Sequence, residues 1–249
     1  MFATESTDIL YARADELGLK PSKLNEYGLL EITTYSGAKQ YIFHSKTALN
    51  SQLSSYLVSN KHTTRQILEQ HNLPNIPYCL PKTQRELRDF FIKHQPVVVK
   101  PTYGHGSHGV RMIDDVAQLD NLDITTIVAE KFIEGQEERY LVLNGQVIAV
   151  HQKLYDGPIN SAETLRRVSL KSDTWHSERT RMAVQIAQVF RLRFAAVDFI
   201  VMSDGTFVVL EVNSAPGIAW FHTPTSGPSV DVAGMLLLAM AKEAEVANL

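Results

Sequence analysis

Two acidic residues stand inside apolar runs on either side of a turn sequence. Asp198 lies within 195–201 and Glu211 lies within 207–212, and the dipeptide at 204–205, Asp-Gly, separates the two runs. Asp-Gly between two strand-like runs predicts a β-hairpin. A two-residue turn at that dipeptide pairs positions whose numbers sum to 409, so we expect Asp198 to lie directly opposite Glu211.

This pairing predicts a cation site. Directly opposite residues of an antiparallel pair have β-carbons about 4.5–5.5 Å apart, where two carboxylates repel unless a cation or proton lies between them. Asn213, two positions beyond Glu211 on the same strand face, adds a neutral oxygen. Oxygen ligands, completed by substrate phosphates, are what Mg²⁺ prefers. In the alternative, Glu211 faces solvent and Asp198 forms a salt bridge, but isolated carboxylates in apolar runs are costly.

A glycine-rich segment follows a lysine at the end of a short β-like run. Lys100 ends 97–100, and Gly104, Gly106 and Ser107 lie in the segment 102–109 that follows it. Glycine lets backbone amides approach phosphate oxygens, and a neighbouring lysine suits a polyphosphate. A P-loop or dinucleotide-binding loop would open a helix, whereas here a second β-like run follows. The pattern predicts a flap over phosphates, with an ordinary surface loop as the alternative.

Hydrophobic spacing and turn signals predict an α+β protein built on antiparallel hairpins. The Thr63-Thr64-Arg65-Gln66 sequence matches a capping box, which places Lys61 just before a helix that stops before Pro74. Asn144-Gly145 is a second strong hairpin signal. Helices are expected near 7–18, 48–58, 63–73, 83–92, 177–190 and 232–241, and strands near 29–35, 40–43 and 97–100.

Composition excludes several classes of protein. The 249 residues are 44% hydrophobic and carry a net charge of −3, which provides no basic field for nucleic acid. The longest apolar stretch, 232–241, is about half the roughly 20 residues that span a bilayer. Cys79 is the only cysteine, so no intramolecular disulfide can form, and we expect a cytoplasmic protein.

Four motifs together resemble the ATP-grasp superfamily over roughly residue 41 to the C-terminus. Within it the chain is similar to the peptide-forming ligases: D-alanine–D-alanine ligase, ribosomal-protein glutamate ligases, cyanophycin synthetase and bifunctional glutathione synthetases. Ala196 stands where D-alanine–D-alanine ligases place an arginine, so their dipeptide activity is not implied. The motifs are Asn60-Lys61-His62-Thr63-Thr64, Val98-Val99-Lys100-Pro101 with its flap, residues 129–137, and Asp198 with 211–217.

The resemblance implies a role for individual residues toward ATP and Mg²⁺, with Mn²⁺ as a substitute. The implied nucleotide-binding residues are Lys61 and Lys100 at the phosphates, Gly104, Gly106 and Ser107 in the flap, Glu130, Lys131, Phe132 and Ile133 along adenine, and Glu137 at the ribose. The implied metal ligands are Asp198, Glu211 and Asn213. Lys100 is expected to stabilise charge in catalysis, and Arg139 to bind a substrate carboxylate or phosphate, with a structural ion pair as the alternative for Arg139.

The resemblance also implies a fold and a reaction. Two lobes of antiparallel sheet and helices would hold ATP between them: 1–59 is a shortened N-terminal substrate-side segment, 60–132 a small lobe with the flap, and 133–249 a large lobe with the Mg²⁺-binding hairpin. An ADP-forming ligase would activate a small-molecule carboxylate as an acyl phosphate and couple it to an amine, an amino acid or peptide. We expect a homo-oligomer or a partner chain to supply the missing substrate platform. A kinase of this superfamily and a non-catalytic ATP-binding sensor domain stay open as alternatives.

Overall fold

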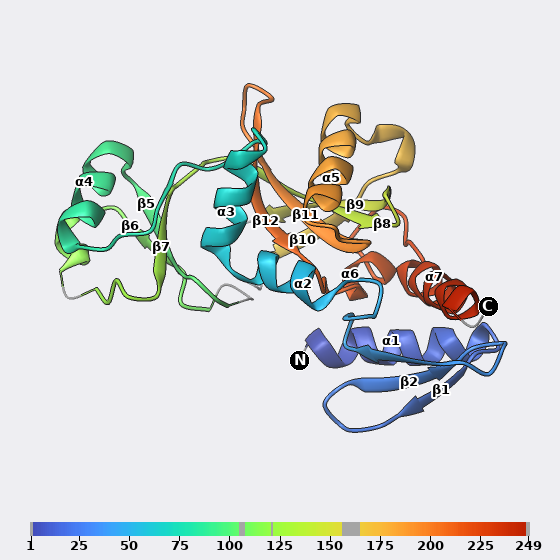
Figure 1. Ribbon diagram of the computed structural model, residues 1–249. Coiled ribbons are helices and arrows are strands. Elements are labelled where there is room, and N and C mark those ends of the chain that lie inside the picture. Colours follow the sequence, from blue (N-terminus) through green and yellow to red (C-terminus); the bar gives the residue numbers. More distant parts are fainter. Residues whose placement is uncertain (1, 105–107, 121, 156–164, 248–249) are drawn as a thin grey trace. The chain divides into compact units, whose positions relative to one another are not determined.

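The structure is a computed structural model that describes residues 2–104, 108–120, 122–155 and 165–247. Its helices and strands form an α+β fold with three sheets (Figure 1). The chain divides into two compact units, which are discontinuous in sequence because strand pairing joins distant segments. Unit 1 comprises Met1–Ser54, Glu138–Val197 and Asn213–Leu249, and unit 2 comprises Ser55–Glu137 and Asp198–Val212. The sequence instead predicts three consecutive segments, 1–59, 60–132 and 133–249.

Unit 1 begins with a helix and a small antiparallel sheet. These are α1 (Phe2–Glu16), β1 (Lys20–Lys23), β2 (Leu29–Thr33) and β3 (Lys39–Phe43), with strand order β1-β2-β3. A five-stranded sheet has the order β10-β9-β8-β11-β12, and its last hairpin continues into unit 2. Its strands are β8 (Gln136–Leu143), β9 (Gln146–Tyr155), β10 (Leu165–Ser169), β11 (Phe194–Val201) and β12 (Phe207–Asn213). The remaining helices are η2 (Ser172–Thr174), α5 (Ser177–Val189), α6 (Ala219–His222) and α7 (Val232–Ala247).

Unit 2 is built around a four-stranded sheet with the order β4-β7-β5-β6. Its strands are β4 (Tyr78–Cys79), β5 (Val97–Pro101), β6 (Arg111–Ile113) and β7 (Ile127–Lys131), all paired antiparallel. Its helices are α2 (Gln52–Ser59), which starts in unit 1, α3 (Lys61–Gln70), α4 (Gln84–His94) and the short η1 (Val116–Leu119). Leu87 and Phe91 of α4 are buried against the sheet residues Val97 and Val99.

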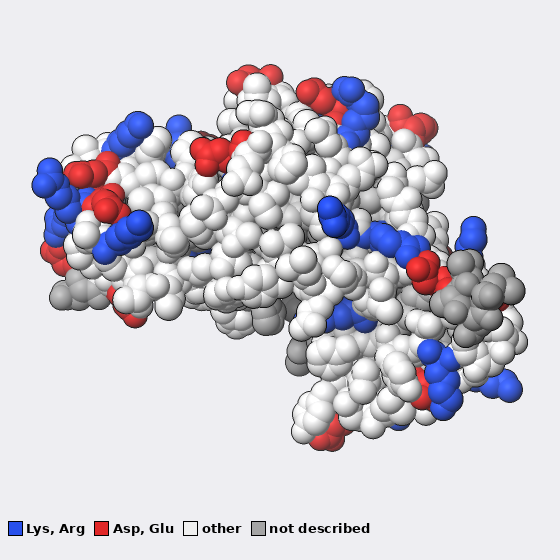
Figure 2. Space-filling view, viewed as in Figure 1, with Lys and Arg blue, Asp and Glu red and all other residues white. Residues whose placement is uncertain are grey.

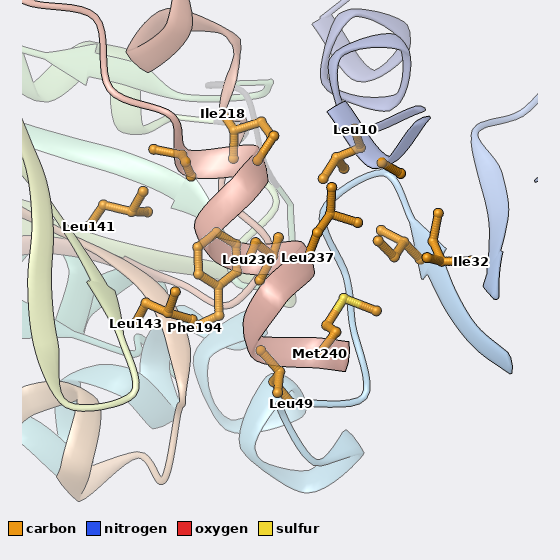
Figure 3. Close-up of a cluster of buried hydrophobic side chains, with 14 of the residues drawn as sticks. Leu10, Ile32, Leu49, Leu141, Leu143, Phe194, Ile218, Leu236, Leu237 and Met240 are labelled. Atoms are coloured by element: carbon orange, nitrogen blue, oxygen red, sulfur yellow. The ribbon is translucent and has the colours of Figure 1, made fainter. Parts of the chain in front are cut away.

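The C-terminal helix α7 is the centre of the core of unit 1. Leu236 and Leu237 of this helix are fully buried or nearly so, and they belong to a cluster that includes Leu10 of α1 and Phe194 of β11. Figure 3 shows these side chains converging from α1, the small sheet and the five-stranded sheet. The apolar stretch predicted from the sequence to be a buried terminal helix is therefore confirmed. No helix within the described ranges is long and apolar enough to cross a membrane.

One buried amide joins the N-terminal segment to two later parts of unit 1. The Asn50 side-chain nitrogen donates to the carbonyl oxygens of Phe194 (2.6 Å) and Ser214 (3.0 Å). Its side-chain oxygen accepts from the backbone N–H groups of Arg193 (2.8 Å) and Phe194 (3.1 Å). Because buried backbone groups need partners, Asn50 satisfies groups that the strand end would otherwise leave unpaired.

Charged side chains of both signs are intermingled on the face that Figure 2 shows, in keeping with the small net charge of −3. Over α4 this mixing includes two ion pairs, Arg85 with Asp89 and Arg88 with Asp120. Exposed pairs of this kind contribute little to stability.

Two local predictions were wrong. Helix α3 begins at Lys61 and is capped by Asn60, whose side chain accepts from the backbone N–H of Thr63, so the capping box does not start at Thr63. Asn competes well for the cap position because its short side chain reaches the first-turn N–H groups. Lys61 is thus the first helical residue rather than the residue before the helix. The cap of α4 at Thr83 is as the sequence predicts.

A histidine helps to cap α7. His222 Nε2 accepts a hydrogen bond from the backbone N–H of Ala233 (3.1 Å), and Asp231 accepts from that of Gly234 (2.9 Å). Burial lowers the pKa of His222, partly offset by the charge of Asp231 and assisted by that of Arg13. Protonation would place an N–H where the acceptor is needed, so the fold requires neutral imidazole.

The stability of the protein should therefore fall in mild acid through His222. An unfolded histidine binds a proton near pH 6.5 while the folded one does not, so the contribution is complete above that pH and is lost below it, at up to about 1.4 kcal/mol per pH unit. Urea unfolding at pH 7.5 and 5.5 measures this loss. His222→Gln should show a smaller loss than the wild type; equal losses would contradict the assignment.

Candidate active site

A buried carboxylate in unit 2 joins two cations. Glu130 of β7 is 1% exposed, and its Oε1 accepts from Arg65 Nε (2.7 Å) while its Oε2 accepts from Lys100 Nζ (2.6 Å). β7 lies beside β5 in the sheet, with Lys100 paired to Val128, which brings the end of β5 to the strand that carries Glu130. Arg65 comes from α3, one helical turn after Lys61. The lysine at the glycine flap is thus held by an acid that itself has a second partner.

Glu130 stays ionised although it is buried. Burial by itself raises the pKa of this carboxyl, and the charges of Arg65 and Lys100 with their hydrogen bonds lower it more, to about 2. Two full hydrogen-bonded partners make the buried charge tolerable. The resemblance in sequence places Glu130 along adenine; its side chain contacts Arg65 and Lys100, so the carboxylate orients the flap lysine.

Lys61 lies at the root of the flap. Its Nζ donates to the carbonyl oxygen of Gly104 (2.9 Å), and its backbone N–H donates to that of Thr102 (2.9 Å). Burial lowers the pKa of Lys61, the charges of Glu211 and Glu130 raise it, and the charge of Lys100 lowers it. Lys61 and Lys100 therefore lie within electrostatic range of each other, where a polyvalent anion would stabilise both ammonium groups. Gly106 and Ser107 lie outside the described residues.

Two tyrosines also anchor the flap root. The hydroxyl oxygens of Tyr56 and Tyr103 lie 3.0 Å apart, and a backbone bridge pairs Tyr103 with Asn60. The start of the flap is therefore tied to the α2–α3 junction just before Lys61. Gly104 has a φ of +146°, a conformation that favours glycine.

The acidic hairpin has a different turn from the predicted one. The Met202 N–H donates to the Thr206 carbonyl (2.8 Å) and the Gly205 N–H to that of Met202 (2.9 Å), with Gly205 at a φ of +84°. This is a three-residue connection with a glycine bulge, so the numbers paired at the turn sum to 408, not 409. The predicted two-residue turn is wrong, because Asp-Gly also suits a turn whose left-handed residue is a bulge glycine.

The three predicted metal ligands differ in their surroundings. Asp198 is 2% exposed in β11, whereas Glu211 in β12 is partly exposed and acts on Lys61. The Asn213 side-chain oxygen accepts from the backbone N–H of Ala215 (2.8 Å). Among the described residues no group of three or more His, Cys, Asp or Glu side chains is gathered for a metal. Two carboxylates with phosphate oxygens fit Mg²⁺, which usually takes only one or two protein carboxylates.

The segment expected along adenine uses some of its backbone groups internally. The N–H of Lys131 donates to the Pro77 carbonyl (2.9 Å) and that of Phe132 to the Pro96 carbonyl (3.0 Å). A recognition role for Lys131 therefore rests on its carbonyl oxygen. Ile133 follows at the end of this segment.

Two predicted residues lie on β8. Glu137 belongs to unit 2 and Arg139 to unit 1, and both are half-buried. Alternation along the strand places Arg139 on the face opposite to Glu138, which is buried with Arg179. The ribose role of Glu137 and the substrate role of Arg139 stay predictions.

Arg65 is a residue of this site that the sequence did not reveal. It is 2% exposed, and besides Glu130 its guanidinium donates to Asn75 and to the carbonyl oxygens of Val209 (2.6 Å) and Leu210 (2.7 Å). The available signal was its position four residues after Lys61, because two cations on one helix face repel unless acids lie beside them.

The α+β fold, with a glycine flap beside two lysines and an acidic hairpin in the same unit, is that of an ATP-grasp protein. The chain belongs to the RimK-like ATP-grasp domain family, whose profile matches residues 58–239. The resemblance read from the four motifs is thereby confirmed.

Individual relatives agree with this assignment. The chain is 27% identical over 191 residues to D-alanine–D-alanine ligase of Pediococcus pentosaceus, covering 70% of this chain and 54% of the relative. It is 28% identical over 151 residues to human N-acetylaspartylglutamate synthase A, covering 57% and 37%. A bifunctional glutathione synthetase from Pasteurella multocida has the same fold over 96% of this chain and 44% of its own, with a TM-score of 0.74 and 14% identity. The chain thus spans about half or less of these relatives.

Removing the charge of Glu130 should strongly destabilise the protein. Glu130→Gln leaves Arg65 and Lys100 as uncompensated buried cations, and loss of one partner from a buried pair costs about 3–5 kcal/mol. Because the folded pKa is about 2, the contribution of Glu130 is complete above its unfolded pKa of about 4.3 and is lost as pH falls toward 2.

Urea unfolding at pH 7 measures this loss. Glu31→Gln is the control, because Glu31 pairs with an exposed lysine, Lys39, and should change the unfolding free energy little. A Glu130→Gln protein as stable as the Glu31→Gln protein would contradict the buried network.

Proposed function

We propose that this protein is an ADP-forming ligase that activates a carboxylate as an acyl phosphate and joins it to an amine. Membership of the RimK-like ATP-grasp family supports the class of reaction. The observation that carries the proposal is the pair of lysines at the flap root, with Lys100 held by Glu130 and Lys61 within range of Glu211. Small-molecule or peptide substrates fit the names of the relatives.

In this proposal the lysines bind the triphosphate and stabilise its charge during transfer. A substrate carboxylate oxygen attacks the γ-phosphorus, the bond to the β-phosphate oxygen breaks, and ADP leaves. The amine then attacks the acyl carbon. The bond between that carbon and the phosphate oxygen breaks, phosphate leaves with the electron pair, and the amine loses a proton. Positioning and charge neutralisation suffice for such a transfer.

Individual residues have distinct roles in the proposal. Lys100 would bind phosphate oxygens in place of part of its contact with Glu130. Lys61 would bind them in place of its hydrogen bond to the Gly104 carbonyl oxygen. Asp198 and Glu211 would hold Mg²⁺ or Mn²⁺, which would supply positive charge that neutralises the phosphates. Asn213 is the third proposed ligand, and its oxygen already accepts one hydrogen bond, from Ala215.

The remaining predicted residues complete the proposed nucleotide site. Gly104, Gly106 and Ser107 would donate backbone amides to the phosphates, and Lys131 to Ile133 would lie along adenine. Glu137 would bind the ribose, and Arg139 a substrate carboxylate. A homo-oligomer or a partner chain completing the substrate platform, and a cytoplasmic location, belong to the same proposal.

A product assay tests the reaction. Purified protein with ATP, Mg²⁺ and pools of acids and amines should release ADP and phosphate only when both an acid and an amine are present. Glu211→Ala should lower this release by more than about 100-fold, because it removes a proposed metal ligand. Loss of a residue that only orients a metal ligand costs about 10- to 100-fold. Glu245→Ala, at an exposed site on α7, is the control and should leave the rate unchanged.

Two other outcomes would contradict the ligase, and a third would contradict the role of the hairpin in it. A stable phosphorylated acid formed without an amine would identify a kinase. Binding of ATP without turnover in any pool would identify a sensor domain. Glu211→Ala protein that keeps the wild-type rate would exclude the hairpin from the reaction.

A further inference from the structure

Near its turn, the acidic hairpin has a strand register that would place Asp198 and Glu211 on opposite faces of the sheet if it continued along both strands. Pairs at the turn sum to 408, as the Met202 to Thr206 hydrogen bond requires. The rings of Phe199 and Phe207 agree, since their centroids lie 5.2 Å apart and an even sum places them on the same face. Continued without interruption, this register would pair Asp198 with Leu210 and place Glu211 on the opposite face.

The burial pattern of β12 agrees with an interrupted register. Val209 is 0% exposed and Val212 is 2% exposed, while Leu210 and Glu211 between them are partly exposed. In a regular strand residues three apart lie on opposite faces. Two buried valines at this spacing, with partly exposed residues between them, agree with one extra residue between the two halves of the strand.

Hydrogen bonds locate the extra residue. Arg65 donates through Nη1 to the carbonyl oxygen of Val209 (2.6 Å) and through Nη2 to that of Leu210 (2.7 Å). Successive carbonyl groups of a regular strand point to opposite edges, so one guanidinium reaches both only where the strand is bulged. The Val209 N–H also turns outward, to the Pro74 carbonyl (3.3 Å).

We infer that Val209 and Leu210 form a β-bulge held by Arg65, and that this bulge returns the register to sums of 409 and places Glu211 on the face of Asp198. Arg65 is in this view a positioning residue for the metal ligands. The inference about the metal rests on the proposed function, whereas the bulge itself does not.

The same guanidinium also positions the flap lysine. Its Nε donates to Glu130, whose other oxygen accepts from Lys100. One side chain thus fixes both the strand that carries Glu211 and the acid that orients Lys100. The charge of Glu211 acts on Lys61, which agrees with a Glu211 side chain that faces the flap lysines.

Paired cysteines test the register directly. Asp198→Cys with Glu211→Cys should form a disulfide on mild oxidation, because disulfides need β-carbons about 3.5–4.5 Å apart. Asp198→Cys with Leu210→Cys is the matched control and should stay reduced, and Cys79→Ser in both removes the native thiol. Non-reducing peptide mapping by mass spectrometry reads the bond. A disulfide to position 210 but not to 211 would overturn the bulge.

A conservative substitution tests the role of Arg65. Arg65→Lys keeps the charge but cannot span two carbonyl groups and Glu130, so backbone hydrogen exchange across 207–213 should become faster. The affinity for Mg·ADP should fall about 10- to 100-fold, as for residues that orient metal ligands. Arg179→Lys is the control, because Arg179 forms a comparable buried pair with Glu138 in unit 1 (2.8 Å), and it should change neither measurement.

The outcomes separate the two proposals. A folded Arg65→Lys protein with wild-type exchange and affinity would overturn the positioning role. Wild-type protein that binds no Mg·ADP would instead overturn the proposed function, and the disulfide pattern would still decide the bulge. Equal losses of affinity in Arg65→Lys and Arg179→Lys would show that loosened packing, not positioning, is the cause.

Discussion

The site depends on one carboxylate, Glu130, kept charged in the interior by Arg65 and Lys100. Removing three ionic groups from water costs several kcal/mol for each ion, and this is offset only when every donor and acceptor finds a partner. Glu130 meets that condition with a cation at each oxygen, and Arg65 also reaches Asn75 and two carbonyl groups of β12. A satisfied network of this kind tolerates few arrangements. It therefore specifies where α3, β5, β7 and β12 lie within unit 2.

Much of the local structure could be predicted because its causes are local. Thr83 caps α4 as predicted, and β5 contains the uninterrupted valine run at 97–99. Asn144 and Gly145 form a turn in which both residues have positive φ. The predicted type of the Asp204-Gly205 turn was wrong for an equally local reason. The same dipeptide serves a two-residue turn and a three-residue turn with a bulge glycine, and only the backbone hydrogen bonds distinguish them.

The site was predictable only in part, because its residues are of two kinds. Lys61, Lys100 and the two hairpin acids stand in recognisable motifs, and the family assignment follows from them. Arg65 acts through contacts with Val209 and Leu210, which are 144 and 145 residues away in the sequence. No periodicity or spacing reports such a contact. Likewise, only the hydrogen bond from Lys100 revealed that the Glu130 side chain is directed toward the lysine of the flap.

The buried amide of Asn50 bears on where this protein could be divided. The family profile begins at residue 58, which invites the view that the preceding stretch is an appendage. Yet Asn50 satisfies backbone groups at Phe194 and Ser214, and Leu10 and Ile32 pack into the cluster around α7. A fragment that began at residue 58 would expose the apolar side chains of α7 to water. The segment that the family profile matches and the segment that must fold together therefore have different boundaries.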